Sequence, residues 1–191
     1  TTEIYTLSLH DALPILGQHQ MWTAQYFDFN APRRLITSGG LGTMGFGLGA
    51  SIGAQLGKPD CKVINIAGDG SFMMNCNELA TAVKNNLPIV IVIMNNNVLG
   101  MVRQWQTLFF DGRYSNTTLD RKTDLVKLAE AFGAEGYRVT KKDELEGILE
   151  KALKSKGPVV IDYVIDNDKK VFPMVAPGAP INQIISEEDI Q

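Results

Sequence analysis

One aspartate and a run of asparagines are the residues of this chain whose types and spacing suggest metal chemistry. Asp69 stands between two glycines directly after an apolar run, and Asn95, Asn96 and Asn97 follow a second apolar run. Both runs are expected strands of a parallel sheet, and ligands of such sheets bind beyond the carboxyl ends of the strands. A carboxylate, a carboxamide oxygen and a backbone carbonyl are hard ligands that suit Mg²⁺, with water and phosphate oxygens completing the octahedron. The spacing therefore predicts a magnesium-diphosphate site.

Glycines and an expected helix start next to Asp69 favour an anionic ligand at the same place. Gly68 and Gly70 let the backbone approach a ligand without an intervening Cβ. The helix expected after Ser71 directs free N–H groups toward that ligand. By itself, Gly-Asp-Gly is usually a turn, and an asparagine-rich strand end is usually a loop cap. Their occurrence at the two ends of one strand-helix-strand unit is what favours the functional interpretation.

Length, charge and cysteine content exclude several classes of protein. The 191 residues are enough for one domain with a full hydrophobic core. A formal net charge of -3 gives no electrostatic footprint for nucleic acid or for an anionic membrane, so neither partner is expected. No apolar run reaches the roughly 18 residues of a membrane span. Cys61 and Cys76 have no metal-ligand spacing, and a reduced, intracellular setting is expected.

Short apolar runs alternate with longer amphipathic runs from Gly17 onward, which predicts βαβ units and an α/β fold with a parallel sheet. The expected strands are residues 34–38, 62–67, 89–94, 137–139 and 159–165. A glycine-rich turn over residues 39–49 leads into a helix that ends near residue 56. Further helices are expected over residues 75–85, where Asn75 and Glu78 match a capping box, over residues 125–132, where Asp124 is the N-cap, and over residues 143–155.

The two ends of the chain differ from its centre. Residues 1–15 lack the basic and long apolar regions of a signal peptide and fit poorly with the alternating pattern that follows. They resemble a translated sequencing-adapter read, so we expect a non-native or disordered leader, and we assign no role to His10 or Asp11. Residues 16–191 form the expected domain, which ends in a proline-rich irregular arm from about Pro173.

The chain resembles thiamine-diphosphate enzymes in the motif Gly68-Asp69-Gly70, which is followed about 25 residues later by Asn95-Asn96. Within that family, it is similar to the C-terminal, cofactor-binding domain of the acetolactate synthase (acetohydroxyacid synthase) catalytic large subunit. The similarity covers about Leu16 to the end of the chain, and its most specific part is GMVRQWQ. The other similar stretches are LGQHQMW, PRRLITSGGLGTMGFGLGASIGAQ and NNNVLGMVRQWQTLFFDGRYS.

The resemblance implies a role for each matching residue. The ligands of Mg²⁺ would be Asp69, the side chain of Asn96 and the backbone carbonyl of Val98. The residues that bind the cofactor would be Gln18, His19, Gly42, Met44, Gly70, Ser71, Gly100 and Met101. The catalytic residues would be Met44, an apolar wedge that bends the cofactor, and Trp105, at the substrate entrance. Met44 and Trp105 could equally be packing residues, and His19 could equally make a structural hydrogen bond.

The resemblance also implies a three-layer α/β/α fold and a transferase that depends on thiamine diphosphate and Mg²⁺. The enzyme would condense pyruvate with a second 2-oxo acid, pyruvate or 2-oxobutyrate, to give acetolactate or acetohydroxybutyrate for branched-chain amino-acid biosynthesis. In full length it would carry FAD and form a homodimer or tetramer, with a regulatory small subunit, in the bacterial cytoplasm or the plant plastid. A missing N-terminal domain would supply the catalytic glutamate, so this chain is expected to be a fragment that is inactive alone.

Three other interpretations remain open at the level of sequence. Another branch of the thiamine-diphosphate enzymes, a 2-oxo-acid decarboxylase or oxidase, would have the same fold. A nicotinamide-binding Rossmann unit is suggested by GLGTMG, residues 40–45, which matches G-x-G-x-x-G. Its ribose-binding acid should close the next strand, but Asp60 precedes that strand and Asp69 lies too far along. A non-catalytic regulatory or packing domain would be favoured only if Asp69 bound no metal.

Overall fold

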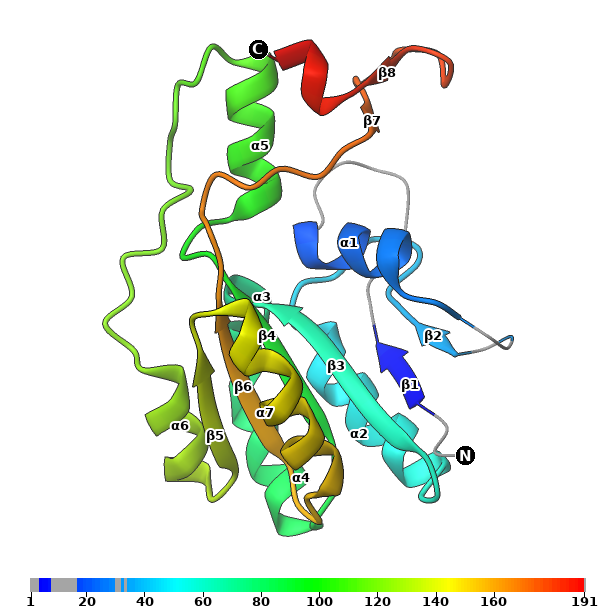
Figure 1. Ribbon diagram of the computed structural model, residues 1–191, viewed down its shortest axis with the longest axis vertical. Coiled ribbons are helices and arrows are strands. Elements are labelled where there is room, and N and C mark those ends of the chain that lie inside the picture. The colour runs from blue at the N-terminus through cyan, green and yellow to red at the C-terminus, as the bar shows by residue number, and fades with distance from the viewer. Residues whose placement is uncertain (1–3, 8–16, 30–31, 33, 191) are drawn as a thin grey trace.

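The computed structural model, which describes residues 4–7, 17–29, 32 and 34–190, is built around one six-stranded parallel sheet (Figure 1). The strand order is β2-β1-β3-β4-β6-β5, and every neighbouring pair runs parallel. The strands are β1 (Ile4–Leu7), β2 (Leu35–Ile36), β3 (Lys62–Gly68), β4 (Val90–Asn95), β5 (Glu135–Val139) and β6 (Val159–Val164). The α/β fold with a parallel sheet is confirmed, and the five strands predicted from residue 34 onward are all present.

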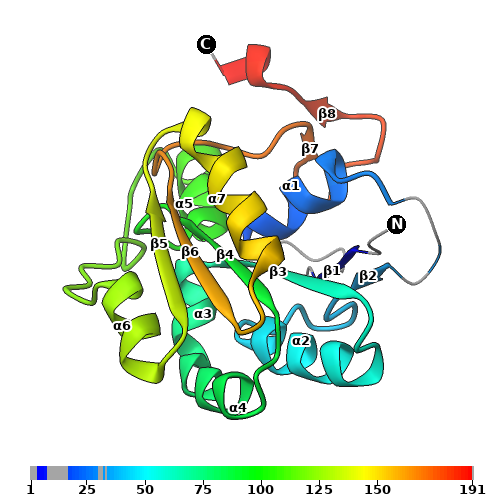
Figure 2. The same cartoon turned by 60° about the horizontal axis from the view of Figure 1, so that its bottom comes forward.

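Helices cover both faces of the sheet, as Figure 2 shows. One face packs against α2 (Phe46–Gly57), α4 (Leu79–Lys84) and α6 (Leu125–Phe132), and the other against α7 (Lys142–Lys154). Ile91 and Ile93 belong to the first core cluster, whereas Val90 and Val92 belong to the second. Because neighbouring residues of a strand point to opposite faces, this central strand has to be apolar throughout. The three-layer α/β/α arrangement is therefore present.

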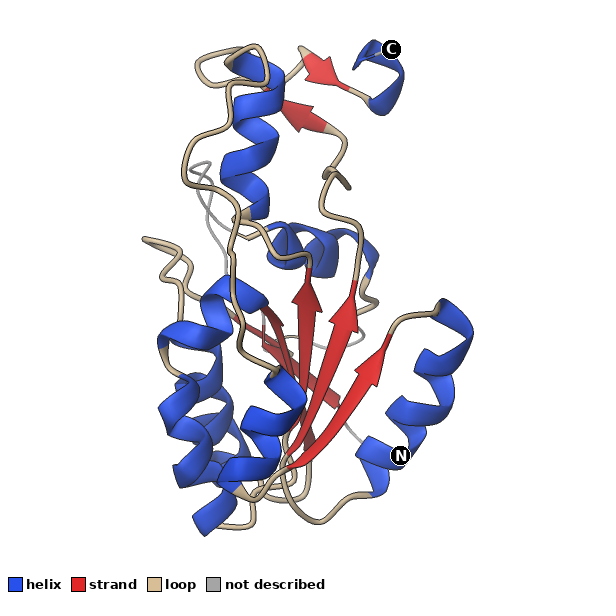
Figure 3. Cartoon of the chain, turned by 90° about the vertical axis from the view of Figure 1, so that its left-hand side faces the viewer, coloured by secondary structure: helices blue, strands red, loops and turns tan. Residues whose placement is uncertain are grey.

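The remaining helices gather at the carboxyl ends of the strands. They are α1 (Gln18–Tyr26), α3 (Asp69–Met74) and α5 (Gly100–Phe109). Figure 3 shows α1 lying across the arrowheads of the strands, with α5 beyond it. The residues with candidate functions are concentrated in these three helices and in the turns that lead into them.

Local signals explain where α6 and α7 begin and end. The carboxylate of Asp124 accepts hydrogen bonds from the backbone N–H groups of Val126 and Lys127 at 3.0 and 3.2 Å. Gly133 ends α6 with a φ of +90°, in the left-handed region that glycine adopts without a Cβ clash. These boundaries, and those of α7, agree with the prediction.

The helix predicted over residues 75–85 is wrong at its start. A first helical segment, α3, begins at Asp69, and a 3₁₀ turn (Cys76–Glu78) separates it from α4. Asn75 caps no helix with its side chain, because its carboxamide instead donates to the carbonyl of Gly45 at 3.1 Å. A tertiary hydrogen bond thus replaces the local capping box.

Four residues of the expected leader belong to the sheet. Ile4–Leu7 form β1 between β2 and β3, with Ile4 opposite Lys62 and Leu7 opposite Asn65. Isoleucine, tyrosine, threonine and leucine are residue types that suit an extended strand. Residues 1–3 and 8–16, with His10 and Asp11, lie outside the described residues.

The chain ends in an arm beside α5 (Figure 1). It contains a short antiparallel ribbon of β7 (Met174–Val175) and β8 (Ile184–Ile185), followed by a 3₁₀ turn (Glu187–Ile190). Among the described residues, no helix combines the length and the apolar character that crossing a membrane requires.

Candidate functional site

A cleft lies at the carboxyl ends of β3 and β4, next to α1 and α5. It is lined by residues 17–19, Trp22, Met44, residues 68–71, Met94, Asn96 and residues 98–102. Ten of the predicted site residues are in this lining: Gln18, His19, Met44, Asp69, Gly70, Ser71, Asn96, Val98, Gly100 and Met101. Gly42 and Trp105 are not. The parallel pairing of β3 with β4, with Gly68 opposite Met94, is what brings the two strand ends together.

Asp69 is the buried anion of the cleft. Only 2% of the residue is exposed, and backbone N–H groups, those of Gly70 and Asn97 among them, lie near its carboxylate and favour the charged form. Burial raises the pKa of Asp69, while the charge of Arg121 and these N–H groups act in the opposite direction. Arg121 forms an ion pair with the carboxylate and also donates to the backbone carbonyl of Asp69 at 2.7 Å. The carboxylate thus already has a cationic partner within the chain.

The turn after β4 presents the second predicted ligand. The carboxamide oxygen of Asn96 accepts the N–H of Val98 at 3.2 Å, and its NH₂ group donates to the side-chain oxygen of Gln18 at 3.1 Å. Asn97 adopts a φ of +56°, in the left-handed region that asparagine tolerates better than most residues. Asn96 therefore lies buried between the turn and α1 and is connected to both.

A chain of buried carboxamides extends from Asn96 across the cleft wall. Gln18 donates to the side-chain oxygen of Gln104 at 3.0 Å and to the carbonyl of Lys169 at 2.6 Å. Gln104, 1% exposed, bonds both backbone groups of Val171, as acceptor at 2.8 Å and as donor at 2.9 Å. Sequence reasoning missed Gln104, although it lies within the motif GMVRQWQ, because a glutamine on an amphipathic helix gives no local sign that it is buried.

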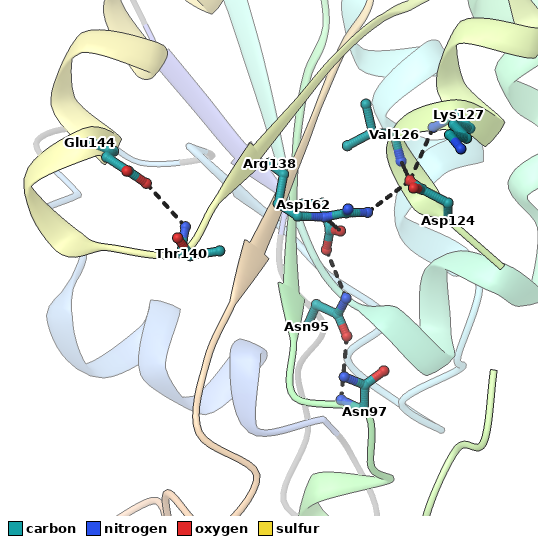
Figure 4. A network of polar contacts seen from close by, with 9 residues as sticks. All are labelled: Asn95, Asn97, Asp124, Val126, Lys127, Arg138, Thr140, Glu144 and Asp162. Carbon is teal, nitrogen blue, oxygen red and sulfur yellow. Dashed lines mark hydrogen bonds and ion pairs between the residues drawn. The ribbon is translucent and has the colours of Figure 1, made fainter. Parts of the chain in front are cut away.

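A second polar network connects the turn after β4 to β6, β5 and the N-terminus of α6, as Figure 4 shows. Asn95 donates to the buried carboxylate of Asp162 on β6 at 2.7 Å, and its oxygen accepts the N–H of Asn97 at 3.3 Å. Arg138 on β5 donates to the other oxygen of Asp162 at 3.0 Å and to Asp124 at 2.7 Å. The turn that carries Asn96 is therefore anchored to two further strands and to the N-terminus of α6.

His19 is a neutral hydrogen-bonding group in this site. The residue is 5% exposed, and burial lowers its pKa from 6.5 to about 4. At neutral pH the imidazole is therefore uncharged and offers one N–H donor. Its ring packs so closely on β3 that a Cβ at Gly68 would lie 3.0 Å from Nδ1.

Met44 and Ser71 both line the cleft, and a hydrogen bond connects the segments that carry them. The Ser71 hydroxyl accepts the N–H of Gly45 at 2.9 Å, which fixes the turn that carries Met44. Gly42 and Gly45 have φ values of +57° and +85°, so this glycine-rich turn depends on left-handed backbone. Gly42 therefore shapes the turn without reaching the cleft lining.

Close approach also explains Gly100, at the start of α5. A Cβ at this position would lie 2.1 Å from the side-chain oxygen of Gln18 and 2.8 Å from the NH₂ group of Asn96. Any larger residue would separate the two carboxamides.

The two tryptophans occupy different positions. Trp105 on α5 is outside the lining and packs edge-on against Phe109, with ring centroids 5.6 Å apart. Trp22 on α1, to which we had assigned no role, is in the lining. The sequence placed both residues within stretches of family similarity, but only the docking of each helix decides which indole faces the cleft.

The donor set of the cleft suits a divalent ion with a diphosphate. The residues that the structure describes contain no group of three or more histidine, cysteine or acidic side chains that could hold a metal ion. One carboxylate with amide and carbonyl oxygens leaves octahedral positions for phosphate and water, as Mg²⁺ prefers. Apolar side chains from Met44, Leu99 and Met101 line the same cleft, which suits a ligand with an aromatic body and a charged end. These residues therefore fit a divalent ion and a diphosphate, and in the chain itself the guanidinium of Arg121 occupies the cation position beside Asp69.

Comparisons with known proteins agree with this chemistry. Residues 16–163 match the thiamine pyrophosphate enzyme C-terminal TPP binding domain. The acetolactate synthase isozyme 2 large subunit of Escherichia coli is 49% identical over 172 residues, which are 90% of this chain and 31% of that protein. The mitochondrial acetolactate synthase catalytic subunit of Saccharomyces cerevisiae is 48% identical over 90% of this chain and 25% of its own length. The acetolactate synthase large subunit of Corynebacterium glutamicum is 48% identical over 92% of this chain and 28% of its own length. This chain therefore spans under a third of the length of these relatives.

The unmodified chain should lose stability at acidic pH because of buried His19, and the variant His19→Gln should lose less. Because the folded pKa of about 4 lies below the unfolded value of 6.5, protons bind the unfolded chain more tightly. The contribution of His19 is complete above pH 6.5, falls by about 2 kcal/mol at pH 5, and is lost progressively toward pH 4. Urea unfolding at pH 7 and pH 5 measures this difference, which should be about 2 kcal/mol smaller in His19→Gln. Equal losses in both proteins would contradict the assignment.

Replacing Asp162 with alanine should destabilise the chain through the network behind the site. Arg138 and half-buried Asn95 would both lose the buried carboxylate that they contact, at a cost of about 2 kcal/mol in the free energy of unfolding. The matched control is Glu150→Ala, which removes an exposed ion pair with Lys154 at 3.7 Å and should cost less than about 0.5 kcal/mol. Urea unfolding of the two variants compares them, and equal costs would contradict a structural role for the network.

Proposed function

Because this chain belongs to the thiamine pyrophosphate enzymes, through their C-terminal TPP-binding domain, we propose that it is the cofactor-binding part of an acetolactate synthase catalytic subunit. The observation that carries this proposal is the cleft at the ends of β3 and β4, which Asp69 and Asn96 both line. The relatives named above, all acetolactate synthases, support the choice of this branch over the 2-oxo-acid decarboxylases and oxidases.

In this proposal, Mg²⁺ is held by the Asp69 carboxylate, the Asn96 side-chain oxygen and the Val98 carbonyl. The ion would then bridge the protein and the cofactor diphosphate, because a divalent cation neutralises both anions at once. Support comes from the parallel pairing of β3 with β4, with Gly68 opposite Met94, which brings the two strand ends together.

The remaining site residues would bind and shape the cofactor. Neutral His19 would donate a hydrogen bond to the diphosphate. Gln18 would line the diphosphate, with its NH₂ group already bonded to Gln104 and Lys169, and Ser71, Gly70 and Gly100 would allow close approach of the backbone. Met44 and Met101 would contact the apolar rings, and Met44 would hold them in a bent form. The bound cofactor would supply the carbanion chemistry, while these residues orient it and exclude water. Trp105 is proposed near the substrate entrance, because it follows Met101 by four residues on the same helix.

For the whole protein we propose condensation of pyruvate with a second 2-oxo acid, pyruvate or 2-oxobutyrate, in branched-chain amino-acid biosynthesis. FAD, and a glutamate from an N-terminal domain in a homodimer or tetramer, would belong to the parts of the relatives that this chain does not span, so the chain alone should lack carboligase activity. Relatives named as large subunits support a smaller, regulatory partner. We propose a cytoplasmic location on the assumption of a bacterial source. The yeast relative is named mitochondrial and the tobacco relatives are named chloroplastic.

Thiamine diphosphate and Mg²⁺ together should raise the melting temperature of this chain more than either does alone. Ligand at about 100 times its dissociation constant stabilises the folded state by about 2.7 kcal/mol, which corresponds to roughly 5–10 °C in a chain of this size. Thermal-shift titrations with each component, with both, and with NAD measure the response. Stabilisation by NAD alone would support a Rossmann site instead.

The variant Asp69→Asn should abolish the joint response, because the diphosphate loses its bridge to the protein. The matched control is Asp60→Asn, which changes an exposed aspartate before β3 by the same charge and should respond as the unmodified chain does. An undiminished response in Asp69→Asn would refute the proposed metal ligand.

A further inference from the structure

Arg121 occupies the cation position of the site in the chain itself. Its guanidinium makes two contacts with one residue: an ion pair with the buried carboxylate of Asp69, and a hydrogen bond of 2.7 Å to the backbone carbonyl. The side chains of Arg121 and Asp69 are 19% and 2% exposed, so the pair is largely shielded from water. A buried carboxylate needs such a partner to remain charged.

The backbone that carries Arg121 is fixed to the turn that carries the other predicted ligands. Thr118 forms a β-bridge with Val98, and two backbone hydrogen bonds flank it, from Leu119 to Asn97 at 2.8 Å and from Leu99 to Thr117 at 2.7 Å. Residues 117–119 therefore run antiparallel to residues 97–99. The arginine reaches Asp69 from a segment that the metal-binding turn itself positions.

A carboxylate that already holds a guanidinium binds a divalent ion only at the expense of that contact. The ion would share a carboxylate that Arg121 already contacts through one oxygen, and two cations on one carboxylate repel each other. Arg121 should thus stabilise the metal-free chain and weaken metal binding at the same site. These two effects have opposite signs, which an ordinary structural arginine would not produce.

Resting on the proposed function, we propose that Arg121 is a resident cation which sets the affinity of the site for its divalent metal. In the metal-free chain it neutralises Asp69, and on metal binding it withdraws from the carboxylate. The free energy of metal binding is then the difference between the interaction of Asp69 with the metal and its interaction with Arg121.

Titration with Mn²⁺ alone, followed by electron paramagnetic resonance of the free ion, tests this proposal. Arg121→Gln should bind Mn²⁺ about tenfold more tightly than the unmodified chain, the equivalent of one lost charge-assisted hydrogen bond. The same variant should melt at a lower temperature without metal. Arg121→Lys keeps the charge and should stay close to the unmodified affinity.

The matched control is Arg113→Gln. Arg113 is 76% exposed and pairs only loosely, at 3.5 Å, with exposed Asp111, so its replacement removes the same charge without touching the site. Unchanged Mn²⁺ affinity in this variant, with tighter binding in Arg121→Gln, supports the proposal. Equal or weaker binding in Arg121→Gln, while Asp69→Asn loses binding, overturns it and leaves the proposed metal site intact. Undiminished binding in Asp69→Asn overturns both.

A measurement on the unmodified chain needs no variant that might unfold. Phenylglyoxal modifies accessible guanidinium groups, and mass spectrometry of peptides reports the rate for each arginine. Arg121 should react slowly without metal and several-fold faster with saturating Mn²⁺, whereas Arg113 should react at one rate throughout. An Arg121 rate that Mn²⁺ leaves unchanged overturns the proposal.

Discussion

The need of one buried carboxylate for a positive partner governs the organisation of this molecule. Asp69 follows β3 at the edge where ligands of parallel sheets bind, and it is 2% exposed. Neighbouring backbone N–H groups reduce the cost of burying its charge but do not neutralise it. In the chain itself Arg121 provides the positive charge. In the cofactor-bound state that we propose, a divalent ion would do so, and the rest of the site can be understood as the support for that exchange.

That support consists of two polar networks that meet at the turn after β4. On the cleft side, Asn96, Gln18 and Gln104 join the turn to α1, α5 and the chain near Val171. In the second network, the hydrogen bond between Asn95 and Asp162 joins the turn to β6. Buried polar groups with their hydrogen bonds satisfied hold one geometry, whereas unsatisfied groups are costly. The position of Asn96 is therefore fixed from several elements that are distant in sequence.

Features that depend on local sequence pattern, such as strands and helix caps, could be predicted from the sequence. The apolar runs of β3, β4 and β6, and the caps of α6, have clear signatures, and a shared sheet edge was enough to bring Asp69 and Asn96 into one cleft. Arg121, Gln104 and Trp22 were missed because their roles depend on how a loop or helix docks. The helix predicted from Asn75 failed for the same reason, since its side chain bonds Gly45 instead of capping. Ile4–Leu7, which were expected to belong to a leader, pair with β2 and β3, and their residue types suit an extended strand.

Anomalous diffraction from crystals of this chain grown with Mn²⁺ and thiamine diphosphate would test the central claim most directly. The account predicts one Mn²⁺ peak within coordination distance of oxygens of Asp69, Asn96, Val98 and the diphosphate, with Arg121 withdrawn from the carboxylate. A peak remote from Asp69, or bound cofactor with the pair of Asp69 and Arg121 still intact, would contradict it.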